Sequence, residues 1–119
     1  MENKEFSRKL EERTKLFALD VIRLSVLLPT TTEGKIIKNQ LTKAGTSVGA
    51  NYREANRSRS RADFSNKIKI CESESSETAY WLEIIRDLNW IENSKSEELL
   101  TETNELLAIF TATGKTLKP

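Results

Sequence analysis

Hydrophobic residues recur along the chain at spacings of three and four, in four stretches separated by short polar segments. In the first stretch, residues 5–28, one helical face carries Phe6, Leu10, Phe17, Val21, Leu24 and Leu28. This spacing is typical of an amphipathic helix whose apolar side faces a core. Pro29 follows directly, and we expect it to end the helix because proline cannot extend the hydrogen-bond ladder.

The second stretch predicts a helix with unusually small residues near its core side. Thr30 and Glu33 have the spacing of a capping box, which would open this helix. Its core-facing positions alternate fours and threes and are Ile37, Leu41, Ala44, Val48, Asn51 and Ala55. Gly45 and Gly49 lie inside the helix, where each costs about 1 kcal/mol relative to alanine. We expect close approach of a neighbouring helix to offset this cost.

The third stretch predicts the longest helix. Ser60 and Asp63 have cap spacing, and the pattern extends to Ile91. One face carries Phe64, Ile68, Cys71, Ser75, Thr78, Leu82 and Ile85, and a second stripe beside it carries Trp81, Ile84, Leu88 and Ile91. The position of Tyr80 and Trp81 beside these two faces favours core packing over a stacking platform.

The fourth stretch completes the pattern. Ser94 and Glu97 again have cap spacing. The apolar face carries Leu99, Thr103, Leu106, Phe110, Thr113 and Leu117. Four helices with short connections predict an all-α protein, a single domain over residues 1–119 folded as an antiparallel up-down-up-down four-helix bundle.

Composition narrows the chemistry that this bundle could perform. The chain has no histidine, and its one cysteine, Cys71, excludes an internal disulfide. Histidine is the commonest general base and metal ligand, so we expect no enzymatic activity, no metal and no cofactor. Cys71 lies on a predicted core face without an identifiable activating base, which favours a buried apolar role. The chain shows no signal-peptide pattern and no apolar run near the ~20 residues of a membrane span, so a cytoplasmic location without membrane contact is expected.

Polar side chains follow the predicted second and third helices near their core faces. The set consists of Gln40, Ser47, Asn51, Glu54 and Glu77. Buried polar groups are costly unless they are paired. We interpret the set as a structural polar network that fixes helix register, or as residues at a solvated rim. A metal site is the disfavoured alternative, because di-iron bundles use histidine together with carboxylates.

Charge is distributed very unevenly, although the formal net charge is only +1. Residues 35–69 hold nine basic and two acidic residues, whereas residues 70–110 hold two basic and ten acidic residues. In an antiparallel bundle, the turn between the second and third helices lies at the same end as both termini. The basic residues expected at this pole are Arg53, Arg57, Arg59, Arg61 and Lys67, together with Lys4, Arg8, Lys9, Lys69, Lys115 and Lys118. The opposite pole would carry Glu33, Asp87, Glu92, Glu97 and Glu98.

Two functional interpretations of this basic pole stand beside a plain solvated surface. Several arginines at one pole can contact the phosphates of RNA or DNA without reading bases. Base stacking has little support, because Tyr52 and Phe64 are the only aromatic residues nearby in the sequence. Alternatively, the protein is a purely structural protein–protein adaptor whose basic segment contacts the acidic helices of another subunit.

Three segments of the sequence also carry a family resemblance. They are RTKLFALDVIRLSVLLP, QLTKAGTSVGANYREANRSRSRADF and ESSETAYWLEII. They resemble the bacterial four-helix-bundle family encoded in intervening sequences of large-subunit (23S) ribosomal RNA genes, roughly from Glu11 to Leu107. The middle segment is the most specific.

This resemblance implies a four-helix bundle that assembles as a homopentamer, and it implies no catalytic residue. A related branch consists of accessory proteins of diversity-generating retroelements, which bind nucleic acid and a reverse transcriptase. The expectation is therefore a non-enzymatic, self-associating nucleic-acid-binding accessory or scaffold protein. The arginines are nominated for the functional surface on their charge alone.

Overall fold

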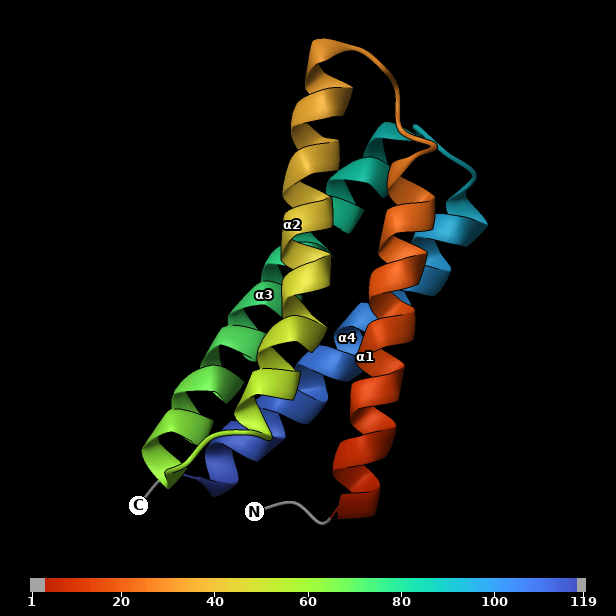
Figure 1. Ribbon diagram of the computed structural model, residues 1–119. Helices are drawn as coiled ribbons and strands as arrows, with labels where there is room; N and C mark the ends of the chain where they lie inside the picture. The colour runs from red at the N-terminus through yellow and green to blue at the C-terminus, as the bar shows by residue number, and fades with distance from the viewer. Residues whose placement is uncertain (1–3, 118–119) are drawn as a thin grey trace.

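Four α-helices account for nearly all of the chain in the computed structural model, which describes residues 4–117. The helices are α1 (Lys4–Ser25), α2 (Thr32–Ala55), α3 (Arg61–Leu88) and α4 (Asn93–Thr116). They alternate in direction, so the α2–α3 turn lies at the same end as both termini (Figure 1). Each helix packs on its neighbour in sequence and α4 also meets α1, which leaves α1 and α3 diagonally opposite. The predicted all-α bundle is confirmed, as a rod of 45 × 23 × 21 Å.

The predicted apolar faces form the hydrophobic core. All seven predicted core positions of α3 are buried, from Phe64 to Ile85. The buried hydroxyl groups on these faces are satisfied locally: Thr78 Oγ1 donates to the Glu74 carbonyl at 2.7 Å and Thr103 Oγ1 to the Leu99 carbonyl at 2.7 Å. Small hydroxylated residues can therefore occupy core positions without leaving an unpaired polar group.

Two helices, α1 and α3, end earlier in the chain than the sequence predicts. The α1 helix ends at Ser25 rather than Leu28, because the Leu27 and Leu28 N–H groups bond to carbonyls only three residues back and tighten the chain into a turn. Leu28 is nevertheless buried. The α3 helix ends at Leu88 rather than Ile91, because Asn89 adopts the left-handed conformation with φ 56° and caps it.

Two of the three predicted N-caps are wrong by one or two residues, and one is confirmed. Ser60 caps α3, with its Oγ accepting from the Asp63 N–H at 3.0 Å. In α2 the cap is Thr31 rather than Thr30, because Thr31 Oγ1 accepts from the Gly34 N–H at 3.1 Å. In α4 the N-cap position is Glu92 rather than Ser94, without a side-chain cap bond.

The contact between α1 and α2 is unusually close at the two glycines of α2. A Cβ atom on Gly45 would lie 2.7 Å from both γ-carbons of Val21. A Cβ atom on Gly49 would lie 3.0 Å from Thr14 Oγ1. The expected close approach of a neighbouring helix is therefore confirmed, and that helix is α1.

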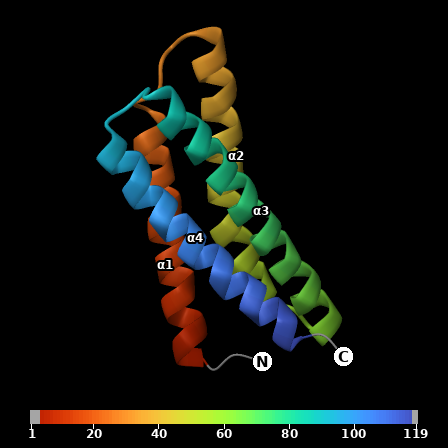
Figure 2. The ribbon, with the colours of Figure 1, turned by 180° about the vertical axis from the view of Figure 1, so that it is seen from behind.

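The seam between α1 and α4, two helices that cross in the view of Figure 2, contains a groove. This groove has a volume of about 590 Å³, and its lining mixes apolar residues such as Leu16, Leu24 and Leu99 with charged residues such as Arg13 and Glu102. Arg13 bridges the seam by donating to Glu102, with Nε 2.7 Å from Oε2, and to Glu105 at 2.8 Å. These bonds, led by the one to Glu102, raise the pKa of Arg13. Among residues 4–117, no helix is long and apolar enough to cross a membrane.

Candidate nucleic-acid interface

The turn between α2 and α3 lies at one end of the rod (Figure 1), and the predicted arginines lie in this turn and at the two helix ends that flank it. The turn is well anchored. The Asn56 N–H donates to the Tyr52 carbonyl at 3.1 Å, and the Asn56 side-chain amide donates to Glu11 of α1 at 2.9 Å. The Ser60 cap fixes the other side of the turn. Residues 57–59 therefore project from two firmly held helix ends.

Arg57 and Arg59 are the freest cations of this turn. Both side chains are exposed, and neither forms an ion pair with any residue between 4 and 117. Both are available to an external anion without first losing an internal partner.

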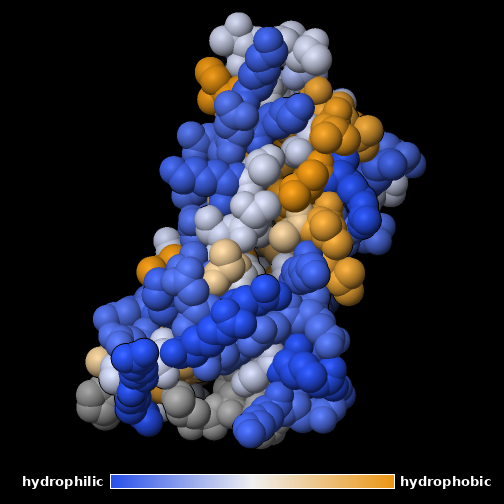
Figure 3. Space-filling view, viewed as in Figure 1, coloured by the Kyte–Doolittle hydropathy of each residue, from blue (hydrophilic) through white to orange (hydrophobic). Residues whose placement is uncertain are grey.

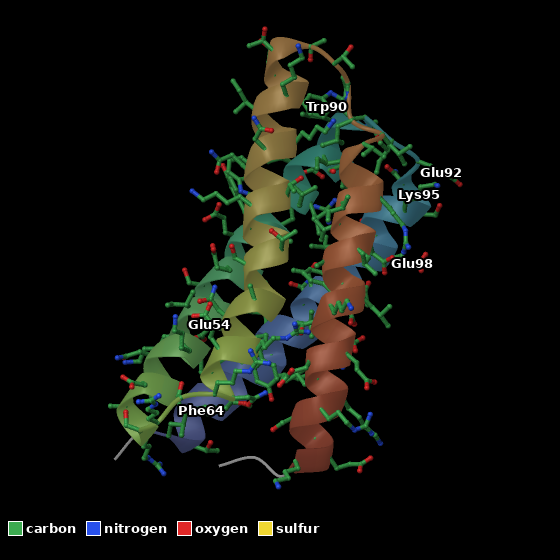
Figure 4. The ribbon with its side chains drawn as sticks, viewed as in Figure 1. Glu54, Phe64, Trp90, Glu92, Lys95 and Glu98 are labelled. Carbon is green, nitrogen blue, oxygen red and sulfur yellow. The ribbon has the colours of Figure 1, made fainter. Side chains whose placement is uncertain are left out.

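The other three predicted site residues have partners inside the protein. Arg53 Nε lies 3.6 Å from Glu11 Oε1, and the Lys67 ammonium lies 2.7 Å from Glu54 Oε1 (Figure 4). Arg61 Nη2 lies 3.5 Å from the carbonyls of residues 116 and 117, at the C-terminal end of α4. The structure brings all five cations to one end, but the two carboxylates partly neutralise two of them.

The two aromatic residues near the turn cannot act as stacking platforms. Tyr52 is fully buried, and its ring packs on Phe110 at a centroid distance of 5.7 Å. Phe64, at the start of α3, is also buried (Figure 4). Base stacking needs an exposed ring face. The basic pole therefore offers positive charge, but neither Tyr52 nor Phe64 offers a ring on which a base could stack.

The remaining predicted charges follow the expected division between the two ends. Lys4, Arg8, Lys9 and Lys115 belong to the helix ends at the basic pole, whereas Lys118 lies outside the described residues. Arg8 is paired within α1 to Glu12 at 2.8 Å. At the other end, Glu92 and Glu98 flank the start of α4 beside Lys95 (Figure 4). The charge dipole along the rod is thus present but weakened by local pairs.

The predicted polar network does not form. Gln40, Glu54 and Glu77 are exposed. The side-chain amide of Asn51 donates to the Ser47 carbonyl at 2.8 Å, and Ser47 Oγ bonds to its own helix. Glu77 accepts from Trp81 Nε1 at 3.1 Å, also within one helix. The alternative, a solvated rim, describes most of the set, because these positions point beside the core rather than into it.

The remaining predictions concern Cys71, a metal site, and the aromatic pair Tyr80 and Trp81. Cys71 is fully buried, with Sγ 3.5 Å from the Val48 carbonyl, and burial raises its pKa to about 12. The thiol is therefore neutral and a poor nucleophile. Within residues 4–117, no three metal-binding side chains of His, Cys, Asp or Glu converge. Trp81 is half-buried against the core, but Tyr80 is 56% exposed, so core packing was wrong for Tyr80.

Sequence reasoning missed two exposed apolar areas. One lies on α1 and the turn directly after it, and consists of Leu16, Leu19, Ile22, Val26 and Leu27. The other lies on α3 and includes Tyr80 and Leu88. The signal was present, since apolar residues of α1 extend well beyond its core-facing positions.

Comparisons with known proteins agree with the fold and bear on the family. The family model described as 23S rRNA-intervening sequence protein matches residues 5–112. A solved structure of a protein of unknown function from the S23 ribosomal protein family of Bacteroides thetaiotaomicron is 31% identical, with a TM-score of 0.81. The match covers 88% of this chain and 97% of that one. A comparison with curated proteins finds no match. The family model covers most of the chain, and the chain folds as the expected four-helix bundle. This chain therefore belongs to the 23S rRNA-intervening sequence protein family.

Proposed function

We propose that this protein is a non-enzymatic, self-associating accessory or scaffold protein that binds nucleic acid through its basic pole without reading sequence. The observation that carries the proposal is the freedom of Arg57 and Arg59, which are exposed and lack an ion pair among the described residues. Guanidinium groups form strong charge-assisted hydrogen bonds with phosphate oxygens. Two such groups per subunit make a modest site, which self-association would multiply.

The neighbouring cations support the same site more weakly. Lys67 and Arg53 would have to exchange Glu54 and Glu11 for phosphate oxygens. Exposed ion pairs contribute roughly 0–1 kcal/mol, so a phosphate can compete for these side chains. The burial of Tyr52 and Phe64 favours binding to the backbone rather than to bases.

A salt titration tests the proposal directly. Binding of fluorescently labelled duplex DNA and single-stranded RNA is measured by anisotropy over a range of salt concentrations. The affinity is expected to fall steeply with salt, by roughly 0.9 log units per log unit of salt for each phosphate neutralised on duplex DNA. The double variant Arg57→Ala/Arg59→Ala should bind more weakly and show a shallower slope.

The matched control removes the same charge from elsewhere in the molecule. Arg23 on α1 and Lys35 at the start of α2 are both exposed, and Arg23→Ala/Lys35→Ala should leave the slope near that of the native protein. Absence of binding at low salt, or equal losses in both double variants, would count against the proposal.

The rival function is a structural adaptor whose arginines serve subunit contacts, and the exposed apolar areas on α1 and α3 favour it. It predicts that Arg57→Ala/Arg59→Ala lowers the mass of the assembly in solution rather than its affinity for nucleic acid. Light scattering on the same variants separates the two functions, and it also measures whether the assembly is the pentamer that we predict. A reverse transcriptase partner stays a prediction, which co-purification with such an enzyme would test.

A further inference from the structure

Two carboxylates lie among the cations of the basic pole. Glu11 on α1 places its Oε1 3.6 Å from Arg53 Nε, and Glu54 on α2 places its Oε1 2.7 Å from the Lys67 ammonium. The two ion pairs therefore link α1 to α2 and α2 to α3. Figure 3 shows mostly hydrophilic residues over this end of the rod, so the charged side chains of the pole are at the surface, where a ligand can reach them.

Neither carboxylate is placed where it would stabilise its own helix. Glu54 is the last residue but one of α2, and the C-terminal end of a helix disfavours negative charge. Glu11 lies past the first turn of α1, beyond the region where the helix dipole attracts acidic side chains. Both ion pairs are partly exposed, and such pairs add little to stability. The main consequence of the two carboxylates is therefore the charge that they remove from the pole.

The two oxygens of Glu11 have different partners. Oε2 accepts from the side-chain amide of Asn56 at 2.9 Å, which ties the α2–α3 turn to α1. Oε1 is the oxygen that faces Arg53. A glutamine here could still accept from Asn56 through its amide oxygen, but it would carry no negative charge to hold Arg53. One substitution can therefore separate the anchoring of the turn from the pairing of the cation.

We propose that Glu11 and Glu54 set the affinity of the basic pole, because each holds one of its cations in an internal ion pair. A phosphate oxygen must displace the carboxylate before it can bind Arg53 or Lys67. Arg57 and Arg59 have no ion pair within residues 4–117 and bind phosphate without this competition. The result is weaker and more readily reversed binding than five free cations would give. This inference rests on the nucleic-acid binding in the proposed function.

The experiment compares the native protein with Glu11→Gln and Glu54→Gln. Binding of labelled duplex DNA is measured by anisotropy over a range of salt concentrations. Each variant should bind about 1.5- to 5-fold more tightly at low salt, the equilibrium equivalent of an exposed ion pair. The slope of log affinity against log salt should steepen by up to about 0.9 for the additional phosphate that is neutralised. Glutamine and glutamate have similar helix propensities, and circular dichroism checks that each variant is folded.

A double-mutant cycle shows whether each carboxylate acts through its own cation. In an Arg53→Ala background, Glu11→Gln should lose most of its gain in affinity, whereas Glu54→Gln should keep its gain. In a Lys67→Ala background, the two results should be reversed. A gain that persists in full without the paired cation would mean that the carboxylate does not act by restraining that cation, which would overturn the proposal.

Two control variants separate this effect from net charge and from a looser turn. Glu97→Gln removes a carboxylate that is paired with Arg86 at the α3–α4 end of the rod, at 3.5 Å, and it should bind like the native protein. Asn56→Ala removes the other partner of Glu11 and leaves Arg53 paired, so it should bind no more tightly than the native protein. A gain in either control equal to that of Glu11→Gln would contradict the proposal.

The same titrations distinguish failure of this inference from failure of the proposed function. If the native protein does not bind DNA even at low salt, both are overturned. If the native protein binds but a glutamine variant keeps the native affinity and slope, the inference is overturned for that carboxylate, and nucleic-acid binding by the basic pole stands.

Discussion

The two seams of α1 are built in opposite ways. Toward α2, Val21 and Thr14 lie directly against Gly45 and Gly49, and the helices pack without room for a methyl group at Gly45. Toward α4, an open groove remains, and Arg13 spans it with bonds to Glu102 and Glu105. Close packing is insensitive to salt, whereas a partly exposed ion pair is screened by it. The first seam is therefore expected to hold α1 in place and the second to guide its orientation.

The largest effect is expected at the closest contact. Gly45→Ala places a methyl group 2.7 Å from two carbons of Val21, and overpacking of this kind costs about 1–3 kcal/mol. The better helix propensity of alanine returns about 1 kcal/mol. We expect a net loss of unfolding free energy in urea denaturation. An unchanged or higher stability would show that this seam is looser than described.

The same substitution at Gly114 is the matched control. A Cβ atom there would have no neighbour within 4 Å, so only helix propensity should act. Gly114→Ala is expected to raise the free energy of unfolding by about 1 kcal/mol. Opposite signs for the two glycines would establish that contact with α1, rather than glycine itself, decides the effect at Gly45.

The ion-paired seam should respond less, and only at low salt. Arg13→Ala removes bonds to Glu102, which like Arg13 is about a third exposed, and to Glu105, which is more exposed. Such pairs contribute about 0.2–1 kcal/mol. We expect a destabilisation of this order at low salt that largely disappears in molar salt. Glu102→Gln should behave similarly. A salt-independent loss would mean that Arg13 acts through the packing of its hydrocarbon chain.

The smallest effect is expected at Gly49. A Cβ atom there meets Thr14 Oγ1 at 3.0 Å, a contact that a shift of a few tenths of an ångström can relieve. The cost of crowding and the gain in helix propensity, about 1 kcal/mol, are similar in size. The melting temperature of Gly49→Ala should therefore lie between those of the Gly45 and Gly114 variants.

Sequence reasoning was most successful where one face of a helix meets the core. The face from Phe64 to Ile85 was predicted position by position, because a buried helix face requires apolar or small residues at every third or fourth position of the sequence. Helix ends were less predictable. Thr30 and Thr31 are chemically equivalent candidates, and only the path of the chain after Pro29 selects Thr31. Ser94 likewise lost its role because α4 begins earlier, without a side-chain cap.

The basic pole was likewise predictable in part: its location followed from the sequence, whereas the partners of its cations did not. Topology and charge counts were enough to place the arginines at one pole, since an antiparallel bundle brings its second turn beside its termini. They could not show that Glu11 partly neutralises Arg53 while Arg57 stays free, because Glu11 is distant in sequence and its reach depends on how α1 packs on α2. The burial of Tyr52 also depends on that packing.

The sequence by itself determined the four helices, most of the residues that face the core and the separation of basic from acidic segments. These properties are periodic or local, and each can be assigned from a few neighbouring residues. Only the tertiary structure decided which cations are free, which apolar residues stay exposed on α1 and α3, and that one seam of α1 is close while the other is open. These properties depend on contacts between residues far apart in the chain, and the spacing of residues along a single helix does not record them.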